Sequence, residues 1–211
     1  LEAYERKKPY CRVKNGEFLK LEDNGIVTAA RLVSAMAPSK KELDRRTIRI
    51  PRNRAFYLDG LCRDREDIHF TGDQMFCSMI RGMKALEGSE FEIPAAYEQV
   101  LRGYQKTGFR WLRALDFWGF GGILADDMGL GKTIQVICVL LDQAQREKAT
   151  SLIVCPASLV YNWESEMERF APSLKTLLVT GPSREREEML AHAQEYDVVV
   201  TSYDLLRRDL H

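Results

Sequence analysis

The chain has 211 residues, 45% of them hydrophobic and 29% charged, and its 31 basic residues balance its 31 acidic residues. This composition suits one large or two small soluble domains that bury their own cores, and a net charge of zero says nothing about nucleic-acid binding. No stretch approaches the about 18 apolar residues of a membrane span, and the first residues lack the apolar core of a secretory signal, so we expect a cytoplasmic protein.

The cysteine and histidine pattern gives no sign of a disulfide framework or a metal site. The cysteine count is odd, no pair has a Cys-x-x-Cys spacing, and the 3 histidines are far apart in the sequence. Charge is unevenly distributed, since residues 1–54 hold 14 Lys and Arg against 7 Asp and Glu. A basic first segment of this kind indicates either contact with phosphates or an ordinary solvated face.

The first part of the chain, residues 1–96, is typical of a small α+β domain. Short alternating runs over residues 10–13 and 17–21 flank Asn15-Gly16, a dipeptide that favours a tight hairpin turn. The other predicted elements are, in chain order, a helix over residues 25–37, an edge strand over 47–51, a strand or short helix from 54 to 58, and a helix over 73–86.

The predicted helix over residues 73–86 carries a methionine-rich stripe at helical spacing, which we interpret as core. Its members are Met75, Phe76, Met79, Ile80 and Met83. After it, Gly88, Ser89 and Pro94 indicate a boundary. We therefore predict two domains, residues 1–96 and residues 97–211.

The second part alternates between helical and strand patterns, which is typical of parallel βαβ units and an α/β fold. The predicted helices cover residues 99–117 and 132–145, a stretch that ends near 169, residues 184–194, and a last segment from Tyr203. The predicted strands cover residues 122–125, 151–155, 174–180 and 197–201.

A glycine loop between the predicted strand 122–125 and the predicted helix 132–145 indicates a phosphate site. Gly129 and Gly131 let the backbone approach phosphates closely, and N–H groups at a helix start attract anions. Lys132 adds a positive charge for the β and γ phosphates, and the Thr133 hydroxyl is suited to hold Mg²⁺. The strict P-loop pattern requires a glycine where Asp126 stands, but the strand-loop-helix context still favours nucleotide binding.

The run from Asp126 to Gln135 resembles motif I of the Swi/Snf family of ATP-dependent DNA translocases, in helicase superfamily two, where an acidic pair and Met precede the glycines. The resemblance implies a RecA-like lobe that binds ATP and Mg²⁺, with Lys132 and Thr133 in catalysis. Residues 101–105 resemble the family's adenine-recognition motif, in which Gln105 would pair with adenine. The implied nucleotide contacts are Arg102, Gln105, Asp127, Met128, Gly129, Leu130, Gly131, Lys132, Thr133 and Ile134.

Two later segments, residues 152–163 and 199–203, resemble motifs that lie on the backbone of double-stranded DNA. The implied contacts are Pro156, Ala157, Ser158, Thr201, Ser202 and Tyr203. Hydroxyls and helix N-termini bind phosphates without reading sequence. Taken singly, the same residues have simpler roles, because Cys155-Pro156 can end a strand and Thr201-Ser202 can cap a helix.

Residues 1–96 resemble, more loosely, the region associated with the motor in bacterial members of the family. This resemblance implies a bacterial, nucleoid-associated protein with a regulatory or DNA-guiding module. In the family, the Asp-Glu motif follows the strand that ends near Thr201 and the arginines lie on a second RecA-like lobe. This sequence ends at His211, before either of them, and it does not begin with Met. We therefore expect an N-terminal portion of a longer translocase that lacks normal ATPase activity by itself.

Two alternative functions remain open at the level of sequence. One is a strand-separating helicase of the same superfamily. The other is a binding module in which residues 1–96 dock a partner such as RNA polymerase, without dependence on nucleotide or on Lys132.

Overall fold

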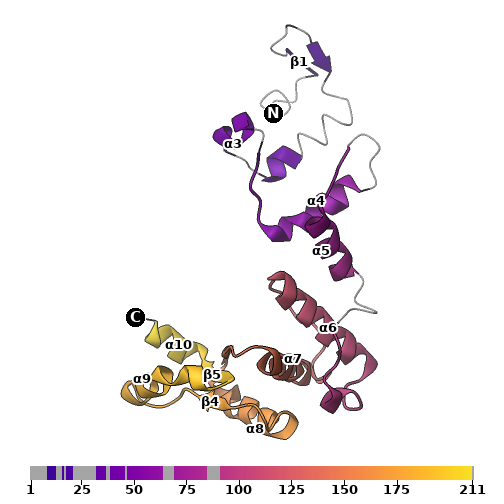
Figure 1. Ribbon diagram of the computed structural model, residues 1–211. Coiled ribbons are helices and arrows are strands. Elements are labelled where there is room, and N and C mark those ends of the chain that lie inside the picture. Colours follow the sequence, from indigo (N-terminus) through magenta and orange to yellow (C-terminus); the bar gives the residue numbers. More distant parts are fainter. Residues whose placement is uncertain are drawn as a thin grey trace. The chain divides into compact units, whose positions relative to one another are not determined.

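The computed structural model describes residues 9–12, 16, 18–20, 32–36, 39–45, 47–63, 69–84 and 91–210 (Figure 1). The chain divides into two compact units, residues 1–81 and residues 82–211, each of which is described by itself. The boundary that the sequence places at residue 96 stays a prediction. No helix in the described ranges is long and apolar enough to cross a membrane.

The first unit begins with the predicted hairpin. Strand β1 (Tyr10–Arg12) pairs antiparallel with β2 (Phe18–Lys20), and Tyr10 lies opposite Lys20. Gly16, in the connection, has a φ of 93°, a left-handed conformation that favours glycine. Asn15 lies outside the described residues. The hairpin itself is confirmed.

Helices make up most of the remaining described part of the first unit. Residues 32–36 are helical, and the rest of the helix predicted over 25–37 lies outside the described residues. The helices that follow are α3 (Lys40–Arg45), the 3-10 turn η1 (Arg52–Arg54), α4 (Ala55–Cys62) and α5 (Gln74–Lys84), which crosses into the second unit. The alternative between strand and helix at residues 54–58 is thereby resolved as helix.

Helix α3 was not predicted, although the sequence carries a signal for it. Ser39 and Glu42 form a capping box, in which the Ser39 N–H donates to Glu42 (2.9 Å) and the Glu42 N–H donates to the Ser39 hydroxyl (3.3 Å). Hydrogen bonds from the hydroxyl and N–H of Ser39, and from the N–H of Arg49, lower the pKa of the Glu42 carboxyl. The Ser-x-x-Glu spacing therefore marks the start of this helix.

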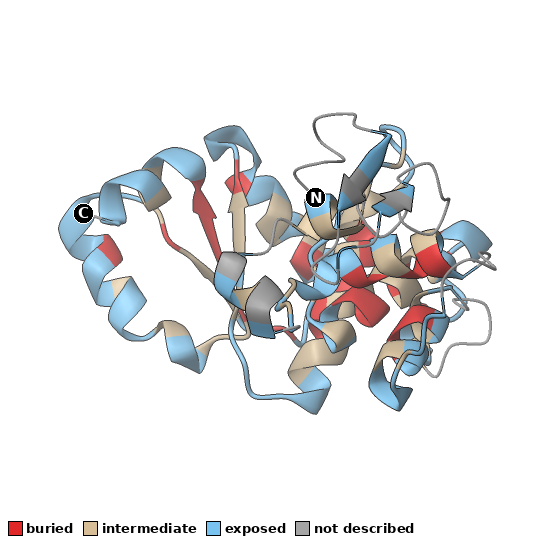
Figure 2. Ribbon diagram, turned by 90° about the horizontal axis from the view of Figure 1, so that it is seen from above, coloured by how far each residue is buried: buried red, intermediate tan, exposed pale blue. Residues whose placement is uncertain are grey.

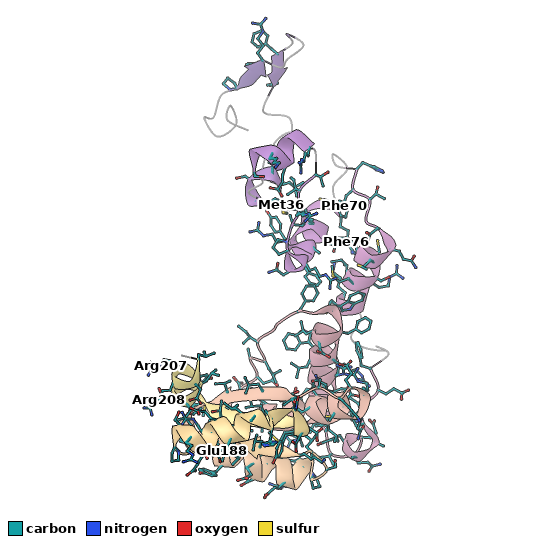
Figure 3. The ribbon with its side chains drawn as sticks, turned by 60° about the vertical axis from the view of Figure 1, so that its left-hand side comes forward. Met36, Phe70, Phe76, Glu188, Arg207 and Arg208 are labelled. Atoms are coloured by element: carbon teal, nitrogen blue, oxygen red, sulfur yellow. The ribbon has the colours of Figure 1, made fainter. Side chains whose placement is uncertain are left out.

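Two predictions for the first unit are wrong. The edge strand over residues 47–51 is irregular chain, because alternation favours an extended backbone but a strand also requires a ladder partner, and no described residue supplies one. The stripe on α5 is only partly core, since Met79 and Ile80 are buried but Met75 is 65% exposed. Nearby, Phe76 packs edge to face against Phe70 at 5.3 Å between ring centroids (Figure 3).

The second unit follows the predicted alternation of helices and strands. Its helices are η2 (Ala95–Tyr97), α6 (Gly103–Trp118), α7 (Lys132–Arg146), η3 (Ala157–Leu159), α8 (Val160–Phe170), α9 (Ser183–Ala191), η4 (Ala193–Glu195) and α10 (Tyr203–Asp209). Its strands are β3 (Ser151–Cys155), β4 (Thr176–Leu178) and β5 (Val198–Ser202).

The described strands of the second unit form a parallel sheet in the order β3-β5-β4, which confirms the predicted βαβ units. The chain passes from β3 over β5 to β4 and then returns to β5. Because such crossovers are right-handed, the two connecting helices α8 and α9 lie on opposite faces of the sheet. Strand β5 is central and buried along its whole length (Figure 2).

The strand predicted over residues 122–125 is wrong. These residues are irregular in the structure, and the Ile123 side chain is 86% exposed. The run is apolar, but it pairs with no strand in the part of the chain that the structure describes. Apolar composition predicts burial, whereas a strand depends on a hydrogen-bonding neighbour that composition cannot supply.

The core of the second unit joins α6, α7, α8 and the sheet. Phe109, Ile137 and Cys138 are fully buried within it, and burial raises the pKa of the Cys138 thiol to about 12. The Tyr97 hydroxyl donates to the Phe170 carbonyl (2.8 Å), and its burial raises the Tyr97 pKa to about 12. Both groups are therefore neutral at physiological pH.

A partly buried ionic network holds α6 against α7. The Arg113 guanidinium, 4% exposed, contacts the Asp142 carboxylate on α7 at 2.5 Å and Asp116 at the same distance. Arg146, also on α7, contacts the same Asp142 carboxylate at 3.0 Å. Because each of these carboxylates meets at least one guanidinium, the two helices that flank the glycine loop keep a defined relative position.

Candidate phosphate loop and sheet edge

The glycine loop has the backbone geometry of an anion cradle. Gly129 and Gly131 have φ angles of 83° and 73°, and α7 begins immediately afterwards at Lys132. A Cβ on Gly131 would lie 2.5 Å from Nε2 of Gln105, so this position requires glycine both for its conformation and for space. The unpaired N–H groups of the first helical turn point toward the loop, where the helix dipole favours negative charge.

The Lys132 ammonium lies inside this loop. Its Nζ donates hydrogen bonds to the backbone carbonyls of Asp126 (2.7 Å) and Asp127 (2.9 Å). Thr133 follows as the second helical residue and is half-buried. The cradle therefore holds a cation, a hydroxyl and free backbone N–H groups within one short segment, as phosphate binding requires. Met128, at the loop tip, is 94% exposed.

Gln105 braces the loop from helix α6. Its Nε2 donates to the Leu130 carbonyl (3.0 Å), and its Oε1 accepts from the N–H of Arg102 (2.9 Å). The Tyr104 hydroxyl donates to the same Leu130 carbonyl (3.0 Å). Both ends of the Gln105 amide are thus engaged and its side chain is buried, so its predicted contact with adenine stays a prediction. Arg102 is exposed at the start of α6.

Gln135, on α7, is a further residue that supports the loop, and sequence reasoning left it unassigned. It is fully buried on α7, and its Nε2 donates to the Asp126 carboxylate (3.0 Å). A Cβ on Gly108 of α6 would stand 1.9 Å from Gln135 Oε1, so α6 approaches α7 closely only because this residue is glycine. The arrangement gives Asp126 a structural role, since its carboxylate anchors the first turn of the loop to α7.

The residues predicted to contact DNA lie where the neighbouring strands β3 and β5 end, at the carboxyl-terminal end of the sheet. In the ladder between β3 and β5, Cys155 lies opposite Ser202, so Pro156 and Tyr203 leave the sheet side by side. Pro156, Ala157 and Ser158 are exposed, and Tyr203 is 61% exposed. These side chains and the backbone around them form an accessible surface at the carboxyl ends of the two strands.

The hydroxyls of Thr201 and Ser202 lie beneath that surface. Thr201 is 4% exposed and Ser202 is 3% exposed. Thr201 Oγ1 donates to the Val179 carbonyl (3.1 Å), and Ser202 Oγ accepts from the Leu205 N–H (3.3 Å) as the N-cap of α10. The helix-capping alternative therefore describes Ser202 in this structure, and contact of either residue with phosphates stays a prediction.

Comparison with family models decides the relationship of this chain. A model described as SNF2-related domain matches residues 104–211, and one described as bacterial SNF2 helicase associated matches residues 1–94. The chain belongs to the SNF2 family. The Swi/Snf resemblance seen in the loop sequence is thus confirmed, together with its bacterial character.

Several relatives of this SNF2-family chain are known by sequence. YwqA of Bacillus subtilis is 42% identical over 146 residues, which cover 67% of this chain and 16% of YwqA. An uncharacterized ATP-dependent helicase of Mycoplasma pneumoniae is 40% identical, covering 62% of this chain and 13% of that protein. The TATA-binding protein-associated factor MOT1 of Saccharomyces cerevisiae is 38% identical, covering 61% and 8%. The chain therefore spans no more than 16% of these relatives.

A solved structure supports the fold. The SWI2/SNF2 ATPase core of Sulfolobus solfataricus, determined in complex with dsDNA, is 39% identical to this SNF2-family chain with a TM-score of 0.50. The match covers 56% of this chain and 25% of the archaeal one. Together with the parallel sheet, it confirms the predicted α/β fold with a RecA-like lobe.

Proposed function

We propose that this chain supplies the ATP phosphate cradle and part of the DNA grip of a motor that translocates on double-stranded DNA and remodels protein–DNA complexes. The observation that carries the proposal is the loop itself, in which Gly129 and Gly131 turn left-handed directly before α7 and Lys132 projects its ammonium inward. Backbone donors and a cation held this way stabilise the charge of phosphoryl transfer.

The residues of the loop fit ATP and Mg²⁺. The Lys132 ammonium now donates to two carbonyl oxygens, and phosphate oxygens offer it the same kind of acceptor with a full negative charge. A Cβ on Gly129 would meet no atom within 4 Å, so the backbone there is open to a ligand. The Thr133 hydroxyl is the group that would hold Mg²⁺, which neutralises charge on the phosphates when it is bound.

For DNA, we propose contact through the exposed surface at the carboxyl ends of β3 and β5, formed by Pro156, Ala157, Ser158 and Tyr203. Thr201 and Ser202 would support that surface from beneath. The DNA complex of the archaeal ATPase core favours this assignment, because this chain shares 39% identity with that protein. Contacts of this kind go to the phosphate backbone, so binding would be independent of sequence and would weaken steeply with salt.

The remaining parts of the proposal concern the whole protein. Residues 1–94 match a region associated with bacterial SNF2 helicases, which favours an accessory role beside the motor. We also propose that the whole protein acts in a bacterial nucleoid and docks a DNA-bound partner such as RNA polymerase. The sequence contains no Asp-Glu pair of the kind that holds Mg²⁺ in the family. We therefore propose that residues 1–211 alone bind ATP more readily than they hydrolyse it.

The test is the ATPase rate of the full-length protein with and without double-stranded DNA. We expect DNA to stimulate turnover, and Lys132→Ala to reduce it at least about a hundredfold, because the charge on the transferred phosphoryl group loses its cation. Lys148→Ala, an exposed lysine after α7, is the matched control and should retain the rate.

Three outcomes separate the proposal from its alternatives. Stimulated turnover without strand displacement supports a translocase, whereas efficient strand displacement identifies a strand-separating helicase. A folded protein with no nucleic-acid-stimulated turnover overturns the motor function. In that case nucleotide-independent binding of RNA polymerase, unaffected by Lys132→Ala, would identify a docking module.

A further inference from the structure

Strand β4 is one of the two edge strands of the described sheet, and it leaves one row of its backbone groups unpaired. The Lys175 carbonyl accepts from the Val198 N–H (3.1 Å), and the Val179 N–H donates to the Val200 carbonyl (2.9 Å). Because strand residues alternate, Thr176 and Leu178 direct their N–H and C=O groups away from β5. Within the described part of the chain, no hydrogen bond joins these groups to another segment.

A cavity of about 250 Å³ lies beside this edge on the face covered by α8. Thr176 contributes its floor, and its hydroxyl donates to Met167 Sδ of α8 (3.2 Å), which shows that the side chain points to this face. Leu174 lines the same cavity, and Glu164 and Glu168 bring carboxylates from successive turns of α8. The cavity thus has a partly apolar floor and an acidic wall.

A second cavity, of about 380 Å³, lies on the opposite face, beneath α9. Leu177 lines it, as expected from strand alternation, together with Met189 and Tyr196. Its carboxylates come from α9 and η4, namely Glu185, Glu188 and Glu195. Both cavities are therefore lined by the edge strand, one on each face of the sheet, and both carry glutamates.

The charge around the edge is negative overall. No Lys or Arg lines either cavity. Arg184 approaches Glu188 at 3.5 Å and His192 approaches Glu195 at 2.9 Å, but both pairs are largely exposed and exposed pairs interact weakly. Glu188 is labelled on α9 in Figure 3. Lys175 is an exposed cation at the start of the strand, a common guard against pairing between identical edges.

We propose that the β4 edge binds an extended basic segment of a partner protein as an additional strand. The unpaired groups of Thr176 and Leu178 would supply ladder hydrogen bonds, and consecutive Lys or Arg side chains of the segment would enter the two cavities. Backbone pairing with pockets for alternate side chains is an established way to recognise peptides. Lys and Arg suit the cavities because their stems pack on apolar floors while their heads meet carboxylates. The carboxylates exclude nucleic acid from this edge by repulsion.

The probe is a fluorescent synthetic peptide, Thr-Val-Arg-Lys-Val-Thr, added to the 211-residue chain. Fluorescence polarisation should show saturable binding, and the backbone amide signals of Thr176 and Leu178 should shift in NMR spectra. A second peptide of the same charge, with alternate backbone nitrogens methylated so that they cannot donate, should bind at least about tenfold more weakly because the ladder is lost.

Charge reversal gives a matched set of protein variants. Glu168→Lys and Glu188→Lys should each weaken binding about tenfold, since each places a cation in one cavity. Glu166→Lys and Glu187→Lys change the same helices by the same charge at residues that line neither cavity, and should leave binding within about twofold. Circular dichroism verifies that all four variants are folded.

Several results would overturn the proposal. These are absence of saturable binding, equal affinity for the methylated peptide, equal loss in the cavity and control variants, or amide shifts confined to residues outside β4. A concentration-dependent dimer that blocks the peptide would also overturn it, in favour of a second copy of the chain as the occupant.

Discussion

The starts of two helices in the second unit, α7 and α10, were both expected to meet phosphates, and the structure makes them very different. In the loop before α7, Gly129 and Gly131 leave the backbone bare and Lys132 stands inside. In the turn before α10, the hydroxyls of Thr201 and Ser202 are buried and already bonded to protein groups. A helix N-terminus is thus available to a phosphate only where its donors are not already consumed by the fold.

The largest effect should come from Gly131→Ala, which challenges the loop side of this comparison. The substitution adds backbone strain, because φ is 73°, and a contact of 2.5 Å between the new Cβ and Gln105. Together these should lower the free energy of unfolding by about 2–4 kcal/mol. Binding of a fluorescent ATP analogue and thermal unfolding measure it. Gly129→Ala has the same left-handed strain but no close neighbour, so its free energy of unfolding should fall by only about 1–2 kcal/mol. Equal behaviour of the two variants would refute the role given to Gln105.

A smaller effect is expected for Gly108→Ala, which tests how α6 and α7 support the loop. Its Cβ would meet Gln135 Oε1, and the resulting overpacking should exceed the gain in helix propensity, for a net loss of about 1–2 kcal/mol. Gly103→Ala, at the first residue of α6 with no atom near its Cβ, should be neutral or stabilising. Chemical denaturation measures both, and a stabilised Gly108→Ala would contradict the close approach.

Ser202→Ala tests the turn before α10. Loss of the N-cap should destabilise the protein by about 1 kcal/mol, measured by chemical denaturation. If the hydroxyl acts only as a cap, DNA affinity of the folded variant stays unchanged. Ser158→Ala should show the reverse, with unchanged stability and weaker DNA binding, because its side chain is exposed. Weaker DNA binding by the folded Ser202→Ala variant would instead support the predicted contact between Ser202 and phosphates.

The smallest effect concerns the pH dependence of the helix that follows this turn. A bidentate ion pair with Arg186 lowers the pKa of Asp209 on α10 below its usual 3.8. A carboxyl with a lowered folded-state pKa stabilises the protein above its unfolded pKa, and this contribution disappears as pH falls through the folded value. Asp209→Asn should therefore be less stable than the parent at pH 7 and converge with it in acid. Parallel acid-unfolding curves would contradict this.

The helices and strands of the second unit were largely predictable, because hydrophobic periodicity reports which face of a local element is buried. Residues 151–155 are a clear case, since the predicted strand and β3 coincide. Residues 122–125 and 47–51 failed for one shared reason, namely that a strand requires a partner elsewhere in the chain. The capping box at Ser39 is a local signal in the sequence that marks the start of α3.

The sequence by itself determined the phosphate loop and the family, because the glycines, Lys132 and Thr133 act through local backbone geometry and adjacent side chains. Tertiary structure alone decided that Gln105 braces the loop, that Gln135 anchors Asp126, and that β4 forms one edge of the described sheet. Those outcomes depend on which distant segments meet, because the fold decides which hydrogen-bond partners come within reach of a buried side chain.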